Sequence, residues 1–375
     1  MFLAIKELKH SKLRFLLIGI ITVLIAWLVF ILAGLGNGLS NLSAATLKNI
    51  DMDYAVFEEG SRASMSRSIL NESLVKDLKN QSGVKDAAPM GATMGTVLKD
   101  KDSAADDSGK VDVAILGIAP GSFLEPEVVE GKSLDKDKPL EVIANDSLKE
   151  KGFKIGDTLK IEGSLEKVKI AGFVSNETYN HLPAIFTTLE KWRSIQFAAP
   201  GSNRGVENPI NAIMLKGKNM DAEKISGQFS KVEIVTKAQA IQGLPGYREE
   251  NGTIMMMLAF LLAISAFVLG VFFYVLTLQK TNQFGVLKAI GASNRFLGRS
   301  IVSQVFLLSL SSILIGILLT YGTALLLPDD MPFQLDIKLV AGYSLLMLFV
   351  SILGSLASVR KITKIDPLLA IGRVE

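Results

Sequence analysis

Four long stretches of the chain contain no charged residue, and they limit the possible folds more than any other feature. They cover residues 15–35, 253–278, 300–327 and 339–359. A helix needs about 20 apolar residues to cross the roughly 30 Å hydrocarbon core of a bilayer. Each stretch is long enough, so we predict four transmembrane helices. The first is longer than the apolar core of a typical signal peptide, which favours a retained anchor.

A long polar segment, residues 40–246, separates the first apolar stretch from the second. β-rich runs alternate along it with helical patterns, which predicts an α/β domain. The expected strands lie at 53–57, 111–118, 158–161, 168–174, 184–187 and 212–215, and the expected helices at 71–79, 146–151 and 221–229. The polar run 99–110, "KDKDSAADDSGK", indicates an exposed loop.

Basic residues gather at three of the boundaries between the predicted helices and water. They are Lys6, Lys9, Lys12 and Arg14; Lys280, Lys288, Arg295 and Arg299; and Arg360, Lys361, Lys364 and Arg373. Short segments rich in Lys and Arg stay in the cytoplasm. We therefore expect a basic N-terminal helix (1–14), a helical loop (279–299) and a tail (360–375) on the cytoplasmic side, with both termini inside. The acidic loop 328–338 and the 40–246 domain would lie outside.

These patterns predict a membrane α-helical protein with a large extracytoplasmic α/β domain inserted between the first and second spans. The chain has no cysteine and two histidines, His10 and His181, which excludes thiol catalysis and a multi-histidine metal site. We find no catalytic motif, and the second to fourth spans carry no charged residue for coupling to ions. We therefore predict no catalytic residue and no metal site, and expect a partner to supply energy.

The segment between the second and third spans, "QKTNQFGVLKAIGASNRFL", contains a short helical pattern over residues 283–290. Phe284, Leu287 and Ile290 recur at helical spacing, Asn282 can cap the start and Gly291 the end. So short a helix is not stable alone. It must pack against lipid head groups or form a docking site for a cytosolic protein.

Two motifs then carry a resemblance: "FGVLKAIGAS" (284–293) and "KITKIDPLLAI" (361–371) are similar to the paired signature of FtsX-like, MacB-type ABC transporter permeases. "GFKIGDTLKI" (152–161) resembles the outer domain of that family. The resemblance implies a homodimer working with two copies of a separate cytosolic ATPase. It also implies that the short helix is the coupling helix, formed by Phe284, Gly285, Leu287, Lys288, Ile290 and Gly291. Gln283 departs from the family, where Glu is common.

A narrower likeness within the family concerns the cargo. "AIKELKHSKLRF" (4–15), "FFYVLTLQKTNQFGVLKAIGA" (272–292) and "MPFQL" (331–335) resemble the haem-efflux permeases of Gram-positive bacteria, the HrtB group. This implies haem as a transported substrate in a bacterial plasma membrane, with no permanently bound cofactor and no nucleic-acid partner. Export of antimicrobial peptides or lipoproteins, and an FtsX-like scaffold that activates cell-wall hydrolases, stay open as alternatives.

Haem iron accepts His, Met, Tyr or Cys ligands, and this chain is poor in His and Cys. Candidate groups gather where the polar segment meets the second span, in "GYREENGTIMMMLAF" (246–260). Arg248 can pair with a propionate, whereas Tyr247, Glu249, Met255, Met256 and Met257 can approach the iron. The alternative is structural: methionines often fill gaps in a core, and Tyr and Arg anchor helices at the interface.

Overall fold

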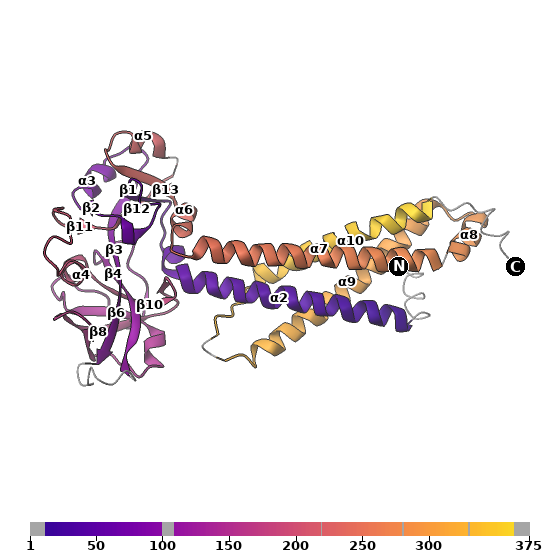
Figure 1. Cartoon of the computed structure of the whole chain (residues 1–375), viewed down its shortest axis with the longest axis horizontal. Coiled ribbons are helices and arrows are strands. Elements are labelled where there is room, and N and C mark those ends of the chain that lie inside the picture. The colour runs from indigo at the N-terminus through magenta and orange to yellow at the C-terminus, as the bar shows by residue number, and fades with distance from the viewer. Residues whose placement is uncertain (1–11, 100–108, 219, 280, 329–330, 364–375) are drawn as a thin grey trace. The chain divides into compact units, whose positions relative to one another are not determined.

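The computed structural model describes residues 12–99, 109–218, 220–279, 281–328 and 331–363 (Figure 1). Contacts divide the chain into two compact units: residues 39–250 form one, and the residues before 39 join those after 250 in the other. Most of the predicted basic helix 1–14, the centre of the predicted loop 99–110 and most of the predicted tail 360–375 lie outside the described residues.

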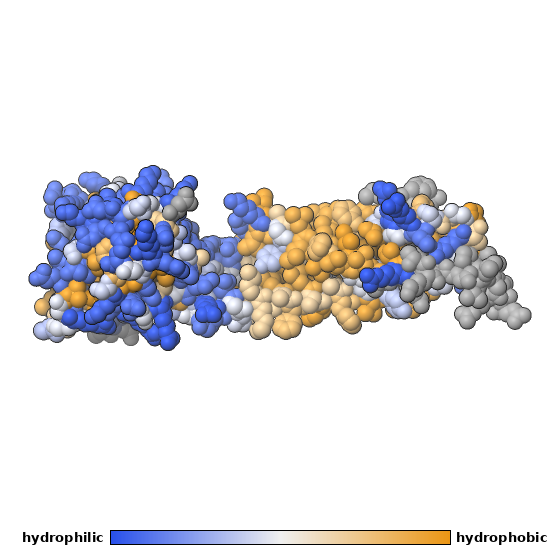
Figure 2. Space-filling model, turned by 90° about the horizontal axis from the view of Figure 1, so that it is seen from above, coloured by the Kyte–Doolittle hydropathy of each residue, from blue (hydrophilic) through white to orange (hydrophobic). Residues whose placement is uncertain are grey.

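Four helices in the described part of the chain are long and apolar enough to cross a membrane, which confirms the predicted fold class. They are α2 (Lys12–Asn49), α7 (Tyr247–Gln279), α9 (Asn294–Ala324) and α10 (Ile337–Thr363). Hydrophobic residues cover the visible middle of this helical unit, whereas the visible face of the α/β unit is mostly hydrophilic (Figure 2). The first helix is longer than its apolar stretch, because Ala44 and Leu47 in its last turns are buried in the core of the α/β unit.

Glycines set the close packing inside the helical unit. A Cβ atom on Gly34 would lie 2.4 Å from the ring of Phe333, and one on Gly36 would lie 2.6 Å from Ile254 of α7. The amide of Gln334 also donates to the carbonyl of Gly34 at 3.1 Å. Small residues allow such approaches in membrane helices. The glycines of the "GLGNG" run thus bring α2 against α7 and against the segment before α10.

The α/β unit is built on one large mixed sheet in the order β13-β1-β12-β3-β4-β10-β6-β8-β5. The β10–β4 and β6–β8 pairs are parallel, β7 pairs with β3 and β8, and β9 pairs with β10. The strands are β1 (Tyr54–Glu58), β3 (Asp86–Lys99), β4 (Val111–Ile118), β5 (Val128–Gly131), β6 (Glu141–Asn145), β7 (Thr158–Ile161), β8 (Lys167–Val174), β9 (Thr178–Tyr179), β10 (Leu182–Thr188), β12 (Ala212–Lys216) and β13 (Val232–Thr236). A second, small sheet joins β2 (Leu70–Asn71) to β11 (Pro209–Ile210).

Two hydrophobic cores form in this unit. One contains the last turns of α2 and the first turn of α7. The other contains residues of the short helices α3 (Leu74–Lys79), α4 (Leu189–Gln196) and α5 (Ala222–Ser226). Trp192 of α4 is fully buried, and Cβ atoms on Gly91 or Gly117 would lie within 2.5 Å of its side chain. Those glycines therefore let α4 lie close to β3 and β4.

All six predicted strands are present. The predicted helices are shorter than expected, and residues 146–149 form a 3-10 helix. The sequence patterns missed the 14-residue strand β3, because "DAAPMGATMGTVLK" is rich in Ala and Gly and has only three of the β-branched residues that mark a strand.

Candidate functional site

The short helix predicted between the second and third spans is present as α8 (Thr281–Ala289). Gly291 ends it with φ of 101°, a left-handed conformation that glycine adopts without strain. The amide of Ala292 donates to the carbonyl of Leu287 and that of Gly291 to the carbonyl of Lys288, both at 2.9 Å. These two bonds make a Schellman cap. The predicted role of Gly291 as a helix end is confirmed.

Ser293 begins the next helix directly after this cap. Its side-chain oxygen accepts a hydrogen bond from the amide of Phe296 at 3.2 Å and so caps the start of α9. The sequence "IGAS" therefore ends one helix and starts another within four residues. This tight connection fixes the direction in which α8 leaves the membrane spans.

The predicted coupling residues divide between the core and the surface. Phe284 is 3% exposed and belongs to a hydrophobic core with residues of α2, α7 and α9. Gly285 is also buried, Leu287 and Lys288 are half-buried, and Ile290 is 79% exposed. Of the three apolar side chains predicted at helical spacing, Phe284 and Leu287 pack in the same core, whereas Ile290 follows the end of α8 and is exposed. Sequence periodicity could not tell which side of so short a helix faces the spans.

Val286 adds an exposed apolar side chain that the sequence analysis did not single out. Together with Ile290, which follows the end of α8, it forms an exposed apolar surface. Phe284 packs the helix against the core of the helical unit. An exposed apolar surface on a rigid, capped helix suits contact with a protein groove or with lipid.

The predicted haem-contacting residues lie in the first turns of α7 and differ in burial. Tyr247 is 8% exposed, and its hydroxyl lies 2.8 Å from the Oγ of Ser40. Arg248 and Glu249 are exposed, and so are Met255, Met256 and Met257. The phenol of Tyr247 is thus engaged in the packing of the α/β unit, whereas the other five side chains are accessible.

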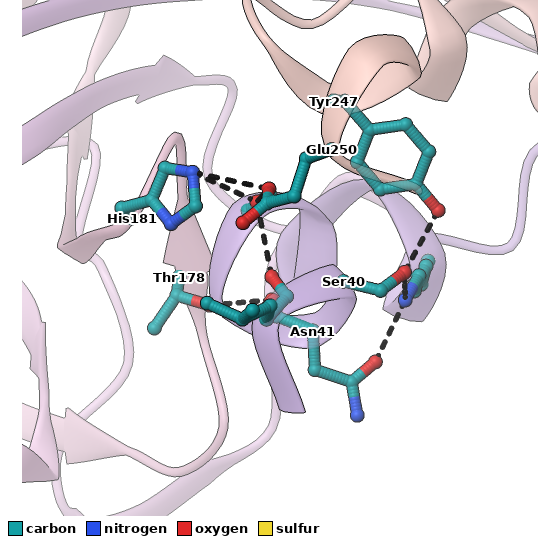
Figure 3. Close-up of polar contacts among 9 residues, drawn as sticks. Ser40, Asn41, Thr178, His181, Tyr247 and Glu250 are labelled. Atoms are coloured by element: carbon teal, nitrogen blue, oxygen red, sulfur yellow. Dashed lines mark hydrogen bonds and ion pairs between the residues drawn. The ribbon is translucent and has the colours of Figure 1, made fainter. Parts of the chain in front are cut away.

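A polar cluster that the sequence did not reveal surrounds the last turns of α2 (Figure 3). Ser43 Oγ lies 3.1 Å from His181 Nε2 and donates to Glu250 Oε2 at 3.3 Å, and the same histidine nitrogen lies 3.6 Å from that carboxylate oxygen. Both contacts fall on one imidazole nitrogen. A catalytic triad needs the acid and the hydroxyl on opposite nitrogens, so this arrangement is structural.

The cluster joins three elements of the α/β unit. Thr178 of β9 donates to the carbonyl of Asn41 at 2.9 Å, while Lys48 Nζ donates to Ser40 Oγ and Asn41 Oδ1, both at 2.8 Å. Lys237 Nζ caps the end of α2 by donating to the carbonyls of Lys48 and Ile50 at 2.8 and 2.6 Å. The contacts fasten α2 to the sheet and to the start of α7. No single sequence motif signals them, because the partners are far apart in the chain.

Glu177 is the one acidic side chain among the described residues that lies below a tenth exposed. The Nδ2 of Asn49 donates to its Oε1 at 2.9 Å. Burial raises the pKa of this carboxyl above its ordinary value, and the hydrogen bond from Asn49 offsets part of that effect. No group of three His, Cys, Asp or Glu side chains suited to a metal ion occurs in the part of the chain that the structure describes.

Four candidate membrane helices and a large, mostly polar α/β unit define the class of the molecule, a membrane protein with a large inserted domain. Residues 15–231 match the family profile of the MacB-like periplasmic core domain, and residues 255–367 match that of the FtsX-like permease C-terminal region. The chain belongs to this family of FtsX-like, MacB-like ABC transporter permeases.

Proteins of similar sequence match this chain over almost its whole length. The putative hemin transport system permease protein HrtB of Staphylococcus haemolyticus is 28% identical over 383 residues, which cover 100% of both chains. An uncharacterized ABC transporter permease of Mycobacterium tuberculosis is 24% identical, with 99% of each chain covered. Among solved structures, the periplasmic region of MacB from Actinobacillus actinomycetemcomitans is 16% identical with a TM-score of 0.38, over 52% of this chain and 94% of that one.

Proposed function

We propose that this chain is the permease subunit of an ATP-driven haem exporter and that a cytosolic ATPase docks on α8. The proposal includes cytoplasmic termini, and a second copy of the chain paired with two ATPases. Haem is supported by relatives that are named as putative hemin transport permeases, at 26–28% identity over almost the whole chain.

The observation that carries the docking proposal is the anchoring of α8. Phe284 lies in a core that also holds Leu269 and Phe273 of α7 and Leu297 and Ile301 of α9. A force applied to the exposed surface of α8 would therefore reach both spans, because a close-packed core transmits displacement and resists deformation. ATP-driven closure of the ATPases would supply that force, and α7 would carry the movement towards the outer end of its span.

Haem contacts are proposed for the accessible residues at the start of α7. Arg248 would pair with a propionate, and Glu249, Met255, Met256 and Met257 would offer oxygen or thioether groups to the iron. All five side chains are exposed. Tyr247 is assigned a positioning role instead, because its hydroxyl already bonds with Ser40.

Docking is tested by co-purifying the ATPase with variants of the permease. Val286→Asp or Ile290→Asp would place a charge on the apolar surface and break the complex while the permease still inserts. Leu165→Asp is the matched control, since it changes a fully exposed leucine of the α/β unit in the same way. If the ATPase co-purifies equally well with all three variants, α8 is a lipid-surface helix and the docking proposal fails.

Cargo is tested by titrating haem into the purified complex and following the Soret band. A saturable shift that Arg248→Ala and Met255→Ala weaken supports both the cargo and its contacts. The absence of any saturable shift in the parent complex would exclude haem.

A further inference from the structure

A cavity of about 240 Å3 lies within the α/β unit. The segments 64–66 and 92–94 form two of its walls, and Tyr179, Gln196, Asn211 and Pro245 complete the lining. None of these residues is acidic or basic. The cavity therefore presents hydroxyl, amide and thioether groups and no formal charge, which selects against ionic ligands.

Tyr179 supplies an unused donor at this cavity. The residue is 4% exposed, and its hydroxyl makes no hydrogen bond with the described residues. The hydroxyl oxygen keeps some accessible surface, as a group that lines a cavity does. Burial also raises the pKa of this phenol well above its ordinary value. The hydroxyl thus stays protonated and can donate to a bound molecule.

Asn211, another polar residue of the lining, connects two segments of the cavity wall. The Nδ2 of Asn211 donates to the carbonyl of Ser68, and its Oδ1 accepts from the amide of Ala92, both at 2.8 Å. Asn211 therefore fixes β3 to the segment that follows residues 64–66. One N–H and the carbonyl oxygen of its side-chain amide are thus engaged within the protein, and Tyr179 adds a hydroxyl to the same lining.

The loop before residue 64 is held in an uncommon conformation. Arg62 and Ala63 have φ of 60° and 55°, a region that side chains other than glycine seldom adopt. Glu233 Oε1 maintains it by accepting from Ser61 Oγ at 2.9 Å and from the amide of Ala63 at 2.8 Å. The wall is thus preformed, so little ordering is needed on binding.

Two methionines provide the apolar part of the cavity. Met65 is buried and Met94 is exposed. Thioethers make favourable contacts with aromatic rings and adapt to their shape. The volume is larger than the roughly 150 Å3 cavity that holds benzene and smaller than the roughly 300–1,000 Å3 pockets of drug-sized ligands. It suits one or two fused rings and is too small for a porphyrin.

We propose that this cavity binds a small uncharged aromatic molecule that carries a hydrogen-bond acceptor, with the Tyr179 hydroxyl as donor and Met65 and Met94 in contact with the ring. This site is separate from the proposed haem contacts and does not depend on them. Its ligand would touch two segments that lead to the helices: Pro245 lies two residues before the start of α7, and Tyr179 follows Thr178, which is bonded to α2. Occupancy would stabilise the α/β unit, because a ligand that binds only the folded state raises its stability.

The test uses the full chain in lipid nanodiscs, with coumarin as the probe and naphthalene as a two-ring compound without an acceptor. Equilibrium dialysis against empty nanodiscs corrects for partition into lipid. We expect saturable coumarin binding to the parent and about tenfold weaker binding to Tyr179→Phe, the effect of one lost hydrogen bond. Naphthalene would bind the two proteins equally. Tyr179→Phe should melt no lower than the parent, since its hydroxyl bonds to no described residue.

A second variant tests the site by blocking the cavity without a change in folding. Ser66 is exposed at the rim, so Ser66→Trp should leave the fold intact and block coumarin. No saturable coumarin binding to the parent would mean that the cavity holds only water, and would overturn the proposal. Equal coumarin binding by parent and both variants would place the site elsewhere. A lower melting temperature of Tyr179→Phe would show that the hydroxyl has a structural partner, which also contradicts the proposal.

Discussion

A Cβ atom on Gly38 of α2 would lie 1.9 Å from the carbonyl oxygen of Pro332. Real Cβ atoms do not approach a backbone oxygen so closely, and the obstacle is main chain that cannot rotate away. The side-chain Nδ2 of Asn37, one residue earlier, donates to the carbonyl of Gln334 at 3.0 Å. The first helix and the segment before the last one are therefore in direct contact.

This contact predicts that Gly38→Ala destabilises the helical unit by about 1–3 kcal/mol, the usual cost of overpacking. Gly252 in α7 is the matched control, because a Cβ atom there meets nothing within 4 Å. Gly252→Ala should stabilise its helix by about 0.5–1 kcal/mol. The stability of each variant is measured by heating the detergent-solubilised protein and recording the fraction that stays monodisperse. Equal melting of the two variants would show that α2 does not pack closely at Gly38.

The different positions of Phe284 and Ile290 predict different effects of the same truncation. Phe284→Ala removes a buried ring and should cost about 3–5 kcal/mol of stability. Ile290→Ala should change stability by less than about 0.5 kcal/mol, because the side chain is exposed. Heating the solubilised permease without its ATPase compares them. If Ile290→Ala were the more destabilising change, the assignment of the buried and exposed sides of α8 would be reversed.

Glu177 predicts a pH dependence of stability. Its pKa is raised by burial, so the folded protein holds the proton more tightly than the unfolded chain does. The stability linked to this proton is present below the ordinary pKa and is lost as the pH rises through the raised value. Glu177→Gln avoids burying the charge, so the variant should be more stable than the parent at neutral pH.

This advantage of Glu177→Gln should shrink as the pH falls through the raised pKa towards 4.5, the ordinary value. Thermal unfolding followed by the fluorescence of the buried Trp192 reports on the α/β unit. Glu207→Gln, at an exposed acid of the α/β unit, controls for general loss of charge. An advantage that stayed constant with pH would show that Glu177 is not buried in its charged form.

Some of this structure follows directly from local sequence. The uncharged stretches predict the spans, and "AIGAS" predicts the end of α8, since a glycine with positive φ and a serine cap act within a few residues. The burial of Phe284 does not follow. In a membrane protein both the packed and the lipid-facing sides of a helix are apolar. The spacing of apolar residues therefore does not show which side is buried in the protein.

The polar contacts at the end of α2 also depend on distant residues. Ser43 and His181 are 138 positions apart, and the packing of α2 against the turn between β9 and β10 brings them together. The same holds for the cavity, whose lining comes from residues 64 to 245. The sequence suggested Tyr247 as an iron ligand, but its bond with Ser40 could be found only once the packing of α2 on α7 was known.

The distribution of basic residues predicts the orientation in the membrane. Because the chain has no cysteine, single cysteines give site-specific labelling. Leu165→Cys in the α/β unit should react with an impermeant maleimide in whole cells, whereas Ala289→Cys at the end of α8 should react only after permeabilisation. Both positions are exposed, so access to the reagent is not limited by packing. The opposite labelling pattern would invert the proposed orientation.

The most direct test of the transport proposal is ATP-driven haem movement in proteoliposomes that contain this permease and its ATPase. We predict haem transport with the parent and with Leu165→Asp, and none with Ile290→Asp, because only the last change alters the docking surface of α8. Transport by Ile290→Asp at the parental rate, or ATP hydrolysis without haem movement in the parent, would contradict the account.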